Sequence, residues 1–305
     1  MARYLVTGGA GFIGSHLVDA LVALGHNVLV LDDLSTGLKA QVNPLATLVQ
    51  GDVADPARVN QVMLGVDGCY HLAAVASVAR GNADWLGTHR SNQTGTVCVL
   101  DAARAAGRIP VVYASSAAIY GCQDSSPLHE SLVPVPMCAY GADKLGSEMH
   151  ARVGWSVHAL PSVGLRFFNV YGPRQNPCSP YSGVISIFAD RMKSNRPIRI
   201  DGDGTQTRDF VYVDDVVEHL LASMEMLARD PQAHVLNVCT GRATSVNQLV
   251  ASISQETGSK SRVSHGPPRD GDMAHALGDP TRAIALLGTL PKTMLVAGLH
   301  KLIAP

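Results

Sequence analysis

The chain lacks both an excess of one charge and any long apolar run. Its 24 Lys and Arg residues nearly balance its 25 Asp and Glu residues, which leaves a formal net charge of −1. A general attraction to nucleic acid or to an anionic membrane is therefore not expected, and an anionic ligand needs locally placed cations. No apolar stretch is long enough to cross a bilayer, and Asp19 with five glycines by position 25 argues against a signal peptide. We expect a cytoplasmic protein that binds neither nucleic acid nor membrane.

Paired cysteines and metal-ligand spacings are also missing. The chain has no Cys-x-x-Cys pair and no His/Cys ligand spacing, because its six cysteines are scattered over positions 69, 98, 122, 138, 178 and 239. This distribution predicts reduced thiols and argues against a bound metal or a disulfide framework. The length of 305 residues and an apolar fraction of 46% provide a core for one large or two smaller domains.

Residues 4–14 run from a short apolar strand into a glycine-rich turn that opens a helix. Glycines at 8, 11 and 14 have the spacing that lets a backbone turn tightly, approach a diphosphate and pack the helix against the strand. The helix N-terminus offers free N–H groups to the phosphates. A second apolar strand over 27–31 ends in Asp32, 18 residues after Gly14, where a carboxylate accepts both hydroxyls of an adenosine ribose.

The two aspartates at the end of that strand indicate which dinucleotide is bound. Asp32 and Asp33 would repel a 2′-phosphate and no arginine lies nearby, so the sequence predicts NAD rather than NADP. The alternative is a pair of surface aspartates with no ligand. The residues expected to contact NAD in this region are Gly8, Gly11, Phe12, Ile13, Gly14, Asp32, Asp33, Ser35, Thr36 and Gly37.

Strands and helices alternate through the first half of the chain. Further strands are expected over 45–50, 68–72 and 110–114, with one helix opened by Asp55-Pro56 and a long one over 91–106. This alternation predicts a Rossmann-type α/β fold, a doubly wound parallel sheet with helices on both faces. Beyond about Phe168 the pattern becomes irregular. We assign residues 1–167 to an NAD-binding domain and 168–305 to a smaller α/β substrate-binding region, some of whose segments return to the sheet.

The carboxyl ends of the strands define where a ligand is expected to bind, because ligands of such sheets lie beyond that edge. Asp52 and Val53 either flank the adenine or occupy an ordinary surface position. The residues placed at this edge are Asp52, Val53, Leu72, Ala73, Ala74, Ser115 and Ser116.

Tyr140 and Lys144 carry the predicted chemistry. They are four residues apart at the start of an expected helix over 140–153, so both side chains project from one helical face. A nearby ammonium favours the phenolate, which predicts that the pKa of Tyr140 lies below its ordinary value of about 10. Tyr140 is then a general base for a sugar hydroxyl, and the hydroxyls of Ser115 and Ser116 donate to the same substrate oxygen. A packed tyrosine beside a solvated lysine is the alternative for the Tyr-x-x-x-Lys spacing alone.

Taken together, these residues resemble the extended short-chain dehydrogenases/reductases of the NAD-dependent epimerase/dehydratase family, and within it the nucleotide-sugar 4-epimerases. The resemblance covers nearly the whole chain. It implies that Ser116, Tyr140 and Lys144 are catalytic and that Asn92, Phe167 and Val170 join the NAD contacts. The segments that carry it are Thr7–Gly14, His71–Ala74, Asn92, Ser115–Gly121, Tyr140 with Lys144, Arg166–Arg174, Arg208–Asp215 and Arg269–Asp272.

The same resemblance implies a UDP-sugar site in the second half and a homodimer. Arg174 either joins this site or braces its loop. The dimer would pack the helices over 91–106 and 140–153 into a four-helix bundle, and the stripe Val97, Leu100 and Ala103 fits that arrangement or ordinary packing on the sheet. Besides Ser116, the residues implied to hold the substrate are Asn169, Gly183, Val184, Arg199, Asp201, Arg208 and Arg269.

Three alanines bear on the reaction and on the sugar. Relatives that dehydrate at C6 carry an Asp-Glu pair where this chain has Ala117-Ala118, so only reversible oxidation at one carbon is implied. Ala276 matches a position that borders the C2 substituent, where a tyrosine restricts relatives to plain hexoses. Alanine there implies interconversion of UDP-GlcNAc and UDP-GalNAc, together with UDP-Glc and UDP-Gal, and the substrate class suggests surface polysaccharide biosynthesis.

The implied mechanism is oxidation at C4 to a 4-keto sugar with transient NADH, rotation of that sugar, and reduction from its other face. Two further hypotheses remain open at this point. One is a nucleotide-sugar reductase or dehydrogenase that consumes the cofactor. The other is a non-catalytic NAD-binding module, against which the combination of Ser116, Tyr140 and Lys144 argues.

Overall fold

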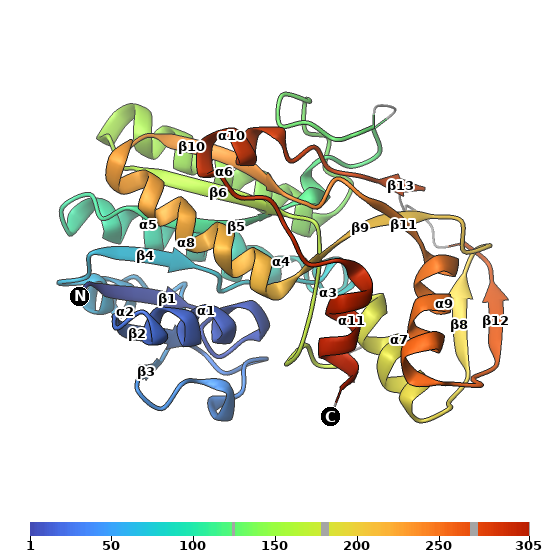
Figure 1. Ribbon diagram of the computed structural model, residues 1–305. Helices are drawn as coiled ribbons and strands as arrows, with labels where there is room; N and C mark the ends of the chain where they lie inside the picture. The colour runs from blue at the N-terminus through green and yellow to red at the C-terminus, as the bar shows by residue number, and fades with distance from the viewer. Residues whose placement is uncertain (124–125, 178–182, 269–273, 305) are drawn as a thin grey trace.

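The computed structural model describes residues 1–123, 126–177, 183–268 and 274–304. Its centre is a seven-stranded, fully parallel sheet, whose strands follow one another from top to bottom at the left of Figure 1. The order places β1 between β4 and β2, which is the switch point of a doubly wound fold. In spatial order the strands are β10 (Ala233–Val238), β6 (Ser162–Phe167), β5 (Val111–Ser116), β4 (Gly68–His71), β1 (Arg3–Thr7), β2 (Asn27–Asp32) and β3 (Thr47–Gln50).

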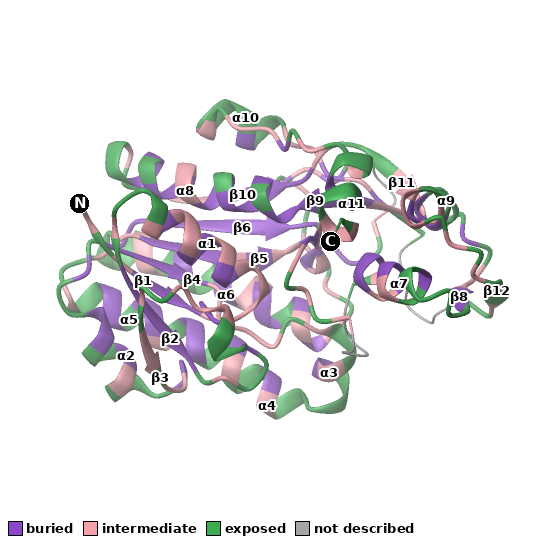
Figure 2. Ribbon diagram, turned by 60° about the horizontal axis from the view of Figure 1, so that its bottom comes forward, coloured by how far each residue is buried: buried purple, intermediate pink, exposed green. Residues whose placement is uncertain are grey.

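Helices cover both faces of this sheet, as the sequence predicts. On one face lie α1 (Phe12–Ala23), α8 (Val213–Arg229) and α10 (Thr281–Leu287), and on the other lie α2 (Pro56–Met63), α5 (Gly95–Ala105) and α6 (Ala139–His158). The inner strands between them are mostly buried, whereas the edge strand β3 has no buried residue (Figure 2). Their apolar runs fit this place, because a parallel sheet is covered on both sides. The predicted Rossmann-type α/β fold is confirmed.

The predicted start of α2 is confirmed, whereas the helix expected over 91–106 begins earlier than predicted. The Asp55 side chain accepts the N–H groups of Ala57 and Arg58, with Pro56 in the first turn of α2, as predicted. The helix expected over 91–106 has a different construction. The helical path starts earlier, with α4 (Trp85–His89) and a π-helical turn (Arg90–Thr94), before α5 begins at Gly95. A π-turn has no simple periodic signature, so the apolar spacing did not reveal it.

The second half of the chain forms a smaller part at the right of Figure 1, but β10, α8 and α10 return to the main sheet. Strand β9 (Thr207–Tyr212) pairs with β7 (Asn169–Tyr171), β11 (Ala243–Ser245) and β13 (His275–Ala276). The strands β8 (Ile198–Asp201) and β12 (Val263–Gly266) form a separate pair. The helices α7 (Val184–Lys193), α9 (Val246–Thr257) and α11 (Leu295–Ile303) pack with these strands around a core of their own.

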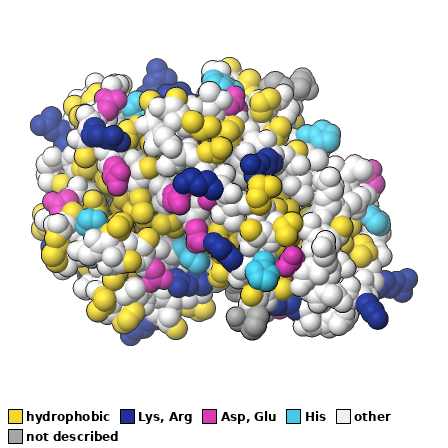
Figure 3. All heavy atoms as spheres, in the orientation of Figure 1, with side chains coloured by type: hydrophobic (Ala, Val, Ile, Leu, Met, Phe, Trp, Pro, Cys, Tyr) yellow, Lys and Arg dark blue, Asp and Glu magenta, His cyan; other side chains and the backbone are white. Residues whose placement is uncertain are grey.

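The surface reflects the balanced composition. On the face shown in Figure 3, basic and acidic side chains are interspersed and no single sign dominates. Within the described ranges, no helix combines the length and hydrophobicity needed to cross a membrane. The same residues contain no group of three or more His, Cys, Asp or Glu arranged to hold a metal ion.

Candidate active site

In the glycine-rich turn after β1, two glycines stand where a Cβ would collide with the backbone, and the third borders open space. Gly8 has a φ of +72°, and a Cβ on it would lie 2.6 Å from the Ala73 nitrogen. A Cβ on Gly14 would lie only 2.1 Å from the Gly8 carbonyl oxygen, so Gly14 lets α1 pack directly on the turn. A Cβ on Gly11 would meet only that oxygen, at 3.2 Å. Gly11 therefore keeps room beyond the protein itself, at a helix N-terminus without a side-chain cap, as a diphosphate requires.

Asp32 stands at the end of β2 and is held rigidly. Its Oδ2 accepts the Ala10 N–H and its Oδ1 accepts the Leu34 N–H, each at 2.9 Å. Burial raises the pKa of Asp32, while these two hydrogen bonds lower it. Each carboxylate oxygen has a further lone pair that can accept a ribose hydroxyl. The neighbouring Asp33 is exposed and accepts the N–H and hydroxyl of Ser35.

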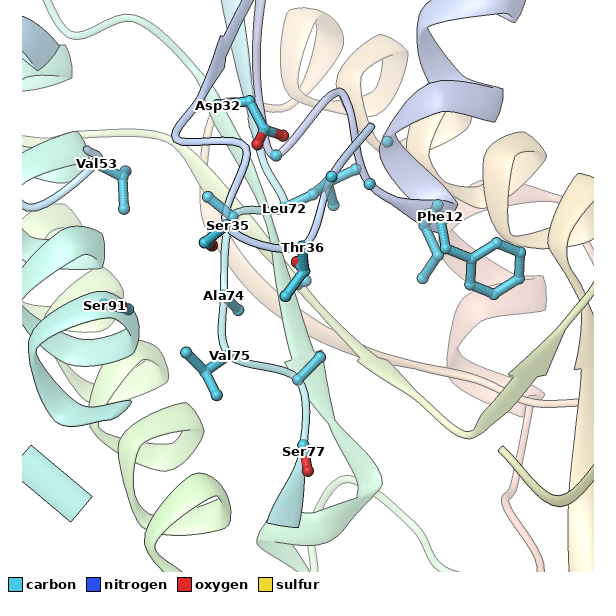
Figure 4. A pocket seen from close by; sticks show the side chains of 18 of the residues that line it. Phe12, Asp32, Ser35, Thr36, Val53, Leu72, Ala74, Val75, Ser77 and Ser91 are labelled. Carbon is cyan, nitrogen blue, oxygen red and sulfur yellow. The ribbon is translucent and has the colours of Figure 1, made fainter. Parts of the chain in front are cut away.

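A cavity of about 650 Å³ extends from Asp32 to Tyr140 along the carboxyl edge of the sheet. In Figure 4, Asp32 lies at one end, the segment from Leu72 to Ser77 runs along the cavity, and Val53 and Ser91 lie across from it. Predicted cofactor residues that line it are Gly8, Gly11, Phe12, Ile13, Gly14, Asp32, Asp33, Ser35, Thr36, Gly37, Asp52, Val53, Leu72, Ala73, Ala74, Ser115, Tyr140, Lys144, Phe167 and Val170, together with Ser116. An extended dinucleotide fits this combination of glycine turn, carboxylate and long cavity.

Several lining residues had no signal in the sequence. Ser77, Arg80, Ser91 and Gln175 contribute to the wall near the segments already singled out. Ser77 is the N-cap of the short helix α3 (Val78–Ala83), and its hydroxyl accepts the Arg80 N–H. An N-cap serine is common in any protein, so nothing in the pattern marked it as part of a site.

Asn92 is the one predicted cofactor residue that lies behind the wall. Its side chain accepts the Val75 N–H at 2.7 Å and donates to the Val75 carbonyl at 3.3 Å. Asn92 thus supports the segment that lines the cavity, and its direct contact with the cofactor stays a prediction. Asp52 does line the cavity, where it forms an ion pair with Arg90 and accepts the Ala54 N–H.

Tyr140 and Lys144 lie in the first two turns of α6, with Cys138 as the N-cap. The Lys144 Nζ donates to the Ala114 carbonyl at 2.7 Å and lies 5.8 Å from the centroid of the Tyr140 ring. Burial lowers the pKa of Lys144 to about 8, against the opposing charge of Asp143.

The prediction that the pKa of Tyr140 lies below its ordinary value is wrong. Burial raises the pKa of Tyr140 above that value, because the phenolate is desolvated, and a hydrogen bond with the Ser116 side chain offsets part of this rise. The Lys144 ammonium donates to the Ala114 carbonyl.

The two serines at the end of β5 do not act as a pair. The Ser115 hydroxyl donates to Glu148 Oε1 at 2.5 Å in the protein interior, whereas Ser116 interacts with Tyr140. The Ser115 hydroxyl is thus committed to a buried carboxylate, while the Ser116 hydroxyl stands beside the proposed base. The prediction that Ser115 also donates to the substrate is therefore corrected, and its contact with the cavity is limited to its position in the wall.

The residues expected to hold the substrate lie on several elements of the smaller part. Asn169, Arg208 and Ala276 occupy three strands joined through β9, where Ala276 stands beside Arg208 in register. Gly183 is the N-cap of α7 and Val184 its first residue. Arg199 and Asp201 lie side by side on the same face of β8 and form an ion pair, with Nε and Oδ1 3.6 Å apart. These residues are absent from the described cavity lining, and Arg269 lies outside the described residues.

Arg174 has a structural role. Its Nη2 donates to Asp19 Oδ2 on α1 at 2.6 Å, and the neighbouring Pro173 carbonyl bonds with His16 of the same helix at 3.0 Å. These contacts tie the loop after β7 to the helix that follows the glycine turn. Arg174 therefore braces this loop and also lines the cavity, so both roles left open for it remain.

Known proteins resemble the chain over almost its full length. The family model described as "NAD dependent epimerase/dehydratase family" matches residues 4–239. A UDP-glucose 4-epimerase of Mycolicibacterium smegmatis is 36% identical over 306 residues, covering 98% of this chain and 96% of that protein. A crystal structure of a Thermotoga maritima UDP-glucose 4-epimerase with UDP-glucose has a TM-score of 0.95 at 36% identity, covering 99% and 97% of the two chains. A Methanobrevibacter ruminantium UDP-N-acetylglucosamine 4-epimerase has a TM-score of 0.94 at 32% identity, with the same coverage.

Proposed function

This chain belongs to the NAD dependent epimerase/dehydratase family, and from that premise we propose that it is a UDP-sugar 4-epimerase that interconverts UDP-GlcNAc and UDP-GalNAc and also accepts UDP-Glc and UDP-Gal. The observation that carries the proposal is the shared cavity. One end has the glycine turn and Asp32, which fit NAD, and the other has Ser116, Tyr140 and Lys144. A relative named as a UDP-N-acetylglucosamine 4-epimerase supports the acetylated substrates.

The distribution of carboxylates favours epimerisation over dehydration. Among the described residues that line the cavity, the acidic ones are Asp32, Asp33 and Asp52, all on the segments that follow β2 and β3. Near Ser116, the short helix over 117–119 offers only Ala117, Ala118 and Ile119. Loss of a C6 hydroxyl needs a second acid/base pair, and none stands beside Tyr140 in this lining.

Tyr140 is the group that exchanges a proton with the sugar. It takes the proton of the 4-hydroxyl and returns it to the 4-keto oxygen at the end of the cycle, and the hydrogen bond with Ser116 offsets part of the cost of ionising it in this buried place. When bound, NAD supplies the acceptor and donor for the hydrogen at C4. Lys144 is placed to hold a hydroxyl of the cofactor ribose, since its ammonium lies beside Tyr140 and has donors beyond the one used by Ala114. The protein must keep NAD bound while the 4-keto sugar rotates to present its other face.

The decisive experiment uses the purified protein and UDP-GlcNAc with no NAD added. An epimerase is expected to form UDP-GalNAc over many turnovers, because the retained cofactor is regenerated in each cycle. Chromatography or NMR measures how much UDP-GalNAc is formed per molecule of protein. Turnover that stops without a continuous supply of NAD would contradict the proposal and support a reductase or dehydrogenase, while retention of NAD with no change in any UDP-sugar would support a binding module.

Ala276 is proposed to admit the acetamido group at C2. It is small, 2% exposed, and adjacent in register to Arg208, which we propose binds the diphosphate with Arg269 and Asn169. Replacing Ala276 by Tyr is expected to lower kcat/KM for UDP-GlcNAc at least tenfold while UDP-Glc changes less than threefold, a difference of about 1 kcal/mol or more between the substrates. Substrate competition assays measure this ratio.

His275→Tyr is the matched control for that variant. His275 neighbours Ala276 in β13, is exposed, and by strand alternation points to the opposite face. It should leave the ratio of the two substrates unchanged. A parallel loss of both substrates in Ala276→Tyr would show that the residue supports the strand and does not select the sugar.

We also propose that the chain forms a homodimer through the outer face of α5 and α6. Of the stripe considered in the sequence, only Val97 is exposed, because Leu100 and Ala103 pack against the sheet. The exposed apolar side chains come mainly from α6, where Met149, Val153 and Val157 stand at helical spacing. An exposed apolar stripe of this kind is suited to a helix pair of a second subunit.

A further inference from the structure

Helix α6 is fastened to the last three residues of β5 by three consecutive turns. The Lys144 Nζ donates to the Ala114 carbonyl, Glu148 accepts the Ser115 hydroxyl, and Tyr140 interacts with the Ser116 side chain. Tyr140, Lys144 and Glu148 are spaced by four residues, so they project from one face of the helix. Each strand residue thus has its own partner on the helix that carries the proposed base.

Glu148 is itself held from the opposite side. Arg166 on the neighbouring strand β6 lies directly beside Ser115 in register. Its Nε donates to Glu148 Oε1 at 2.9 Å and its Nη2 to Oε2 at 2.7 Å, and both residues are buried. A two-pronged pair of this kind fixes the orientation of the carboxylate. The second guanidinium edge donates to the Tyr120 hydroxyl at 2.9 Å, which donates in turn to Asn237 of β10.

Ser115 and Ser116 are neighbours at the end of β5. The hydrogen bond from Ser115 to Glu148 therefore holds this end of the strand against α6 and fixes where the Ser116 hydroxyl stands relative to Tyr140. We propose that Ser115, anchored by Glu148 and Arg166, is a positioning residue that acts on the reaction only through Ser116. The inference rests on the proposed function, because the group it places is the partner of the catalytic tyrosine.

The pH profile of kcat/KM distinguishes a positioning role of Ser115 from a merely structural one, because loss of stability alone would not shift that profile. The hydrogen bond with Ser116 lowers the pKa of Tyr140, so weakening it raises that pKa and moves the acid limb of kcat/KM to higher pH. The other charged or titratable groups around Tyr140 are Lys144 and Asp143 on its own helix, Cys138 at the cap, Arg80 in the cavity wall, and His89, which bonds with Asp143 at 2.8 Å. Removing the Ser115 hydroxyl changes none of these.

The test is a double-mutant cycle with Ser115→Ala in the wild-type and Ser116→Ala backgrounds. Ser115 is preferred to Glu148, because removing Glu148 would leave Arg166 buried without its partner and endanger folding. Ser115→Ala alone is expected to lower kcat about tenfold with KM within twofold, and to move the acid limb to higher pH, since misplacement of a catalytic group has effects of this size or larger. In the Ser116→Ala background it is expected to cause no further loss. Ser115→Thr should restore most of the activity, and Ser115→Cys, a weaker donor, should lie in between.

Ser147→Ala provides the matched control. Ser147 is equally buried on α6, but its hydroxyl bonds with Thr96 and the Asp143 carbonyl and does not touch β5. It should leave the acid limb in place at a comparable change in melting temperature. Equal losses from Ser115→Ala in both backgrounds, or an unmoved acid limb, would overturn the positioning role. Absence of wild-type turnover with every UDP-sugar would instead contradict the proposed function.

Discussion

Tyr140→Phe is expected to lower epimerase turnover by about 10²–10⁴-fold while NAD stays bound. The variant removes only the phenolic oxygen, which we propose exchanges a proton with the sugar hydroxyl. General acid–base catalysis by a positioned side chain contributes this range of rate. Turnover is measured with UDP-Glc and UDP-GlcNAc, and bound NAD is released by denaturation and quantified in the same preparation.

Tyr113→Phe controls for the loss of a buried hydroxyl. Tyr113 lies on β5, is 1% exposed, and is not part of the cavity lining. Its replacement should leave turnover within about threefold of wild type, as expected for a change away from the reacting groups. Substantial activity in Tyr140→Phe would mean that another group takes the proton, and the assignment of Tyr140 as the base would be wrong.

Gly11→Ala and Gly14→Ala are expected to separate cofactor binding from folding. In Gly11→Ala the new Cβ meets one backbone oxygen at 3.2 Å and the backbone has an ordinary φ of −84°. Stability should change by less than about 1 kcal/mol. Retained NAD should nevertheless fall at least tenfold, because the methyl group occupies the space that the glycine leaves for the diphosphate.

In Gly14→Ala the new Cβ would lie 2.1 Å from the Gly8 carbonyl oxygen, so α1 must move away from the turn. This overpacking should reduce the free energy of unfolding by about 1–3 kcal/mol and weaken NAD binding as well. Denaturant unfolding and the content of bound NAD measure the two quantities. Full retention of NAD in Gly11→Ala would refute the placement of the diphosphate at this turn.

Local patterns allowed most of the framework to be predicted. The apolar runs that became β1, β2 and β5 are short and bounded by turn residues, and buried parallel strands need little more than this. The glycine turn, Asp32 and the Tyr-x-x-x-Lys pair depend on spacing within a single segment. These segments meet in one cavity because they follow the carboxyl ends of neighbouring parallel strands.

Contacts between segments that are far apart in the chain could not be predicted. Nothing in the sequence indicated that Asn92 holds the backbone of Val75. Leu100 belongs to the core because α5 lies on the sheet, and the stripe alone could not distinguish this face from a subunit contact. The contacts of a side chain with distant segments depend on tertiary packing, which the spacing of residues within one segment does not reveal.

The sequence by itself determined the doubly wound sheet and the NAD-binding turn, because these depend on periodicity and spacing within single segments. The proposed catalytic residues came from the Tyr-x-x-x-Lys spacing together with the resemblance to the family. Only the tertiary structure decided how those residues act. It set Ser115 against Glu148 and Arg166, turned Ser116 toward Tyr140, and directed Lys144 to the Ala114 carbonyl. The pKa of a phenol depends on its desolvation and on the groups that reach its oxygen, and both are fixed only when α6 packs on β5.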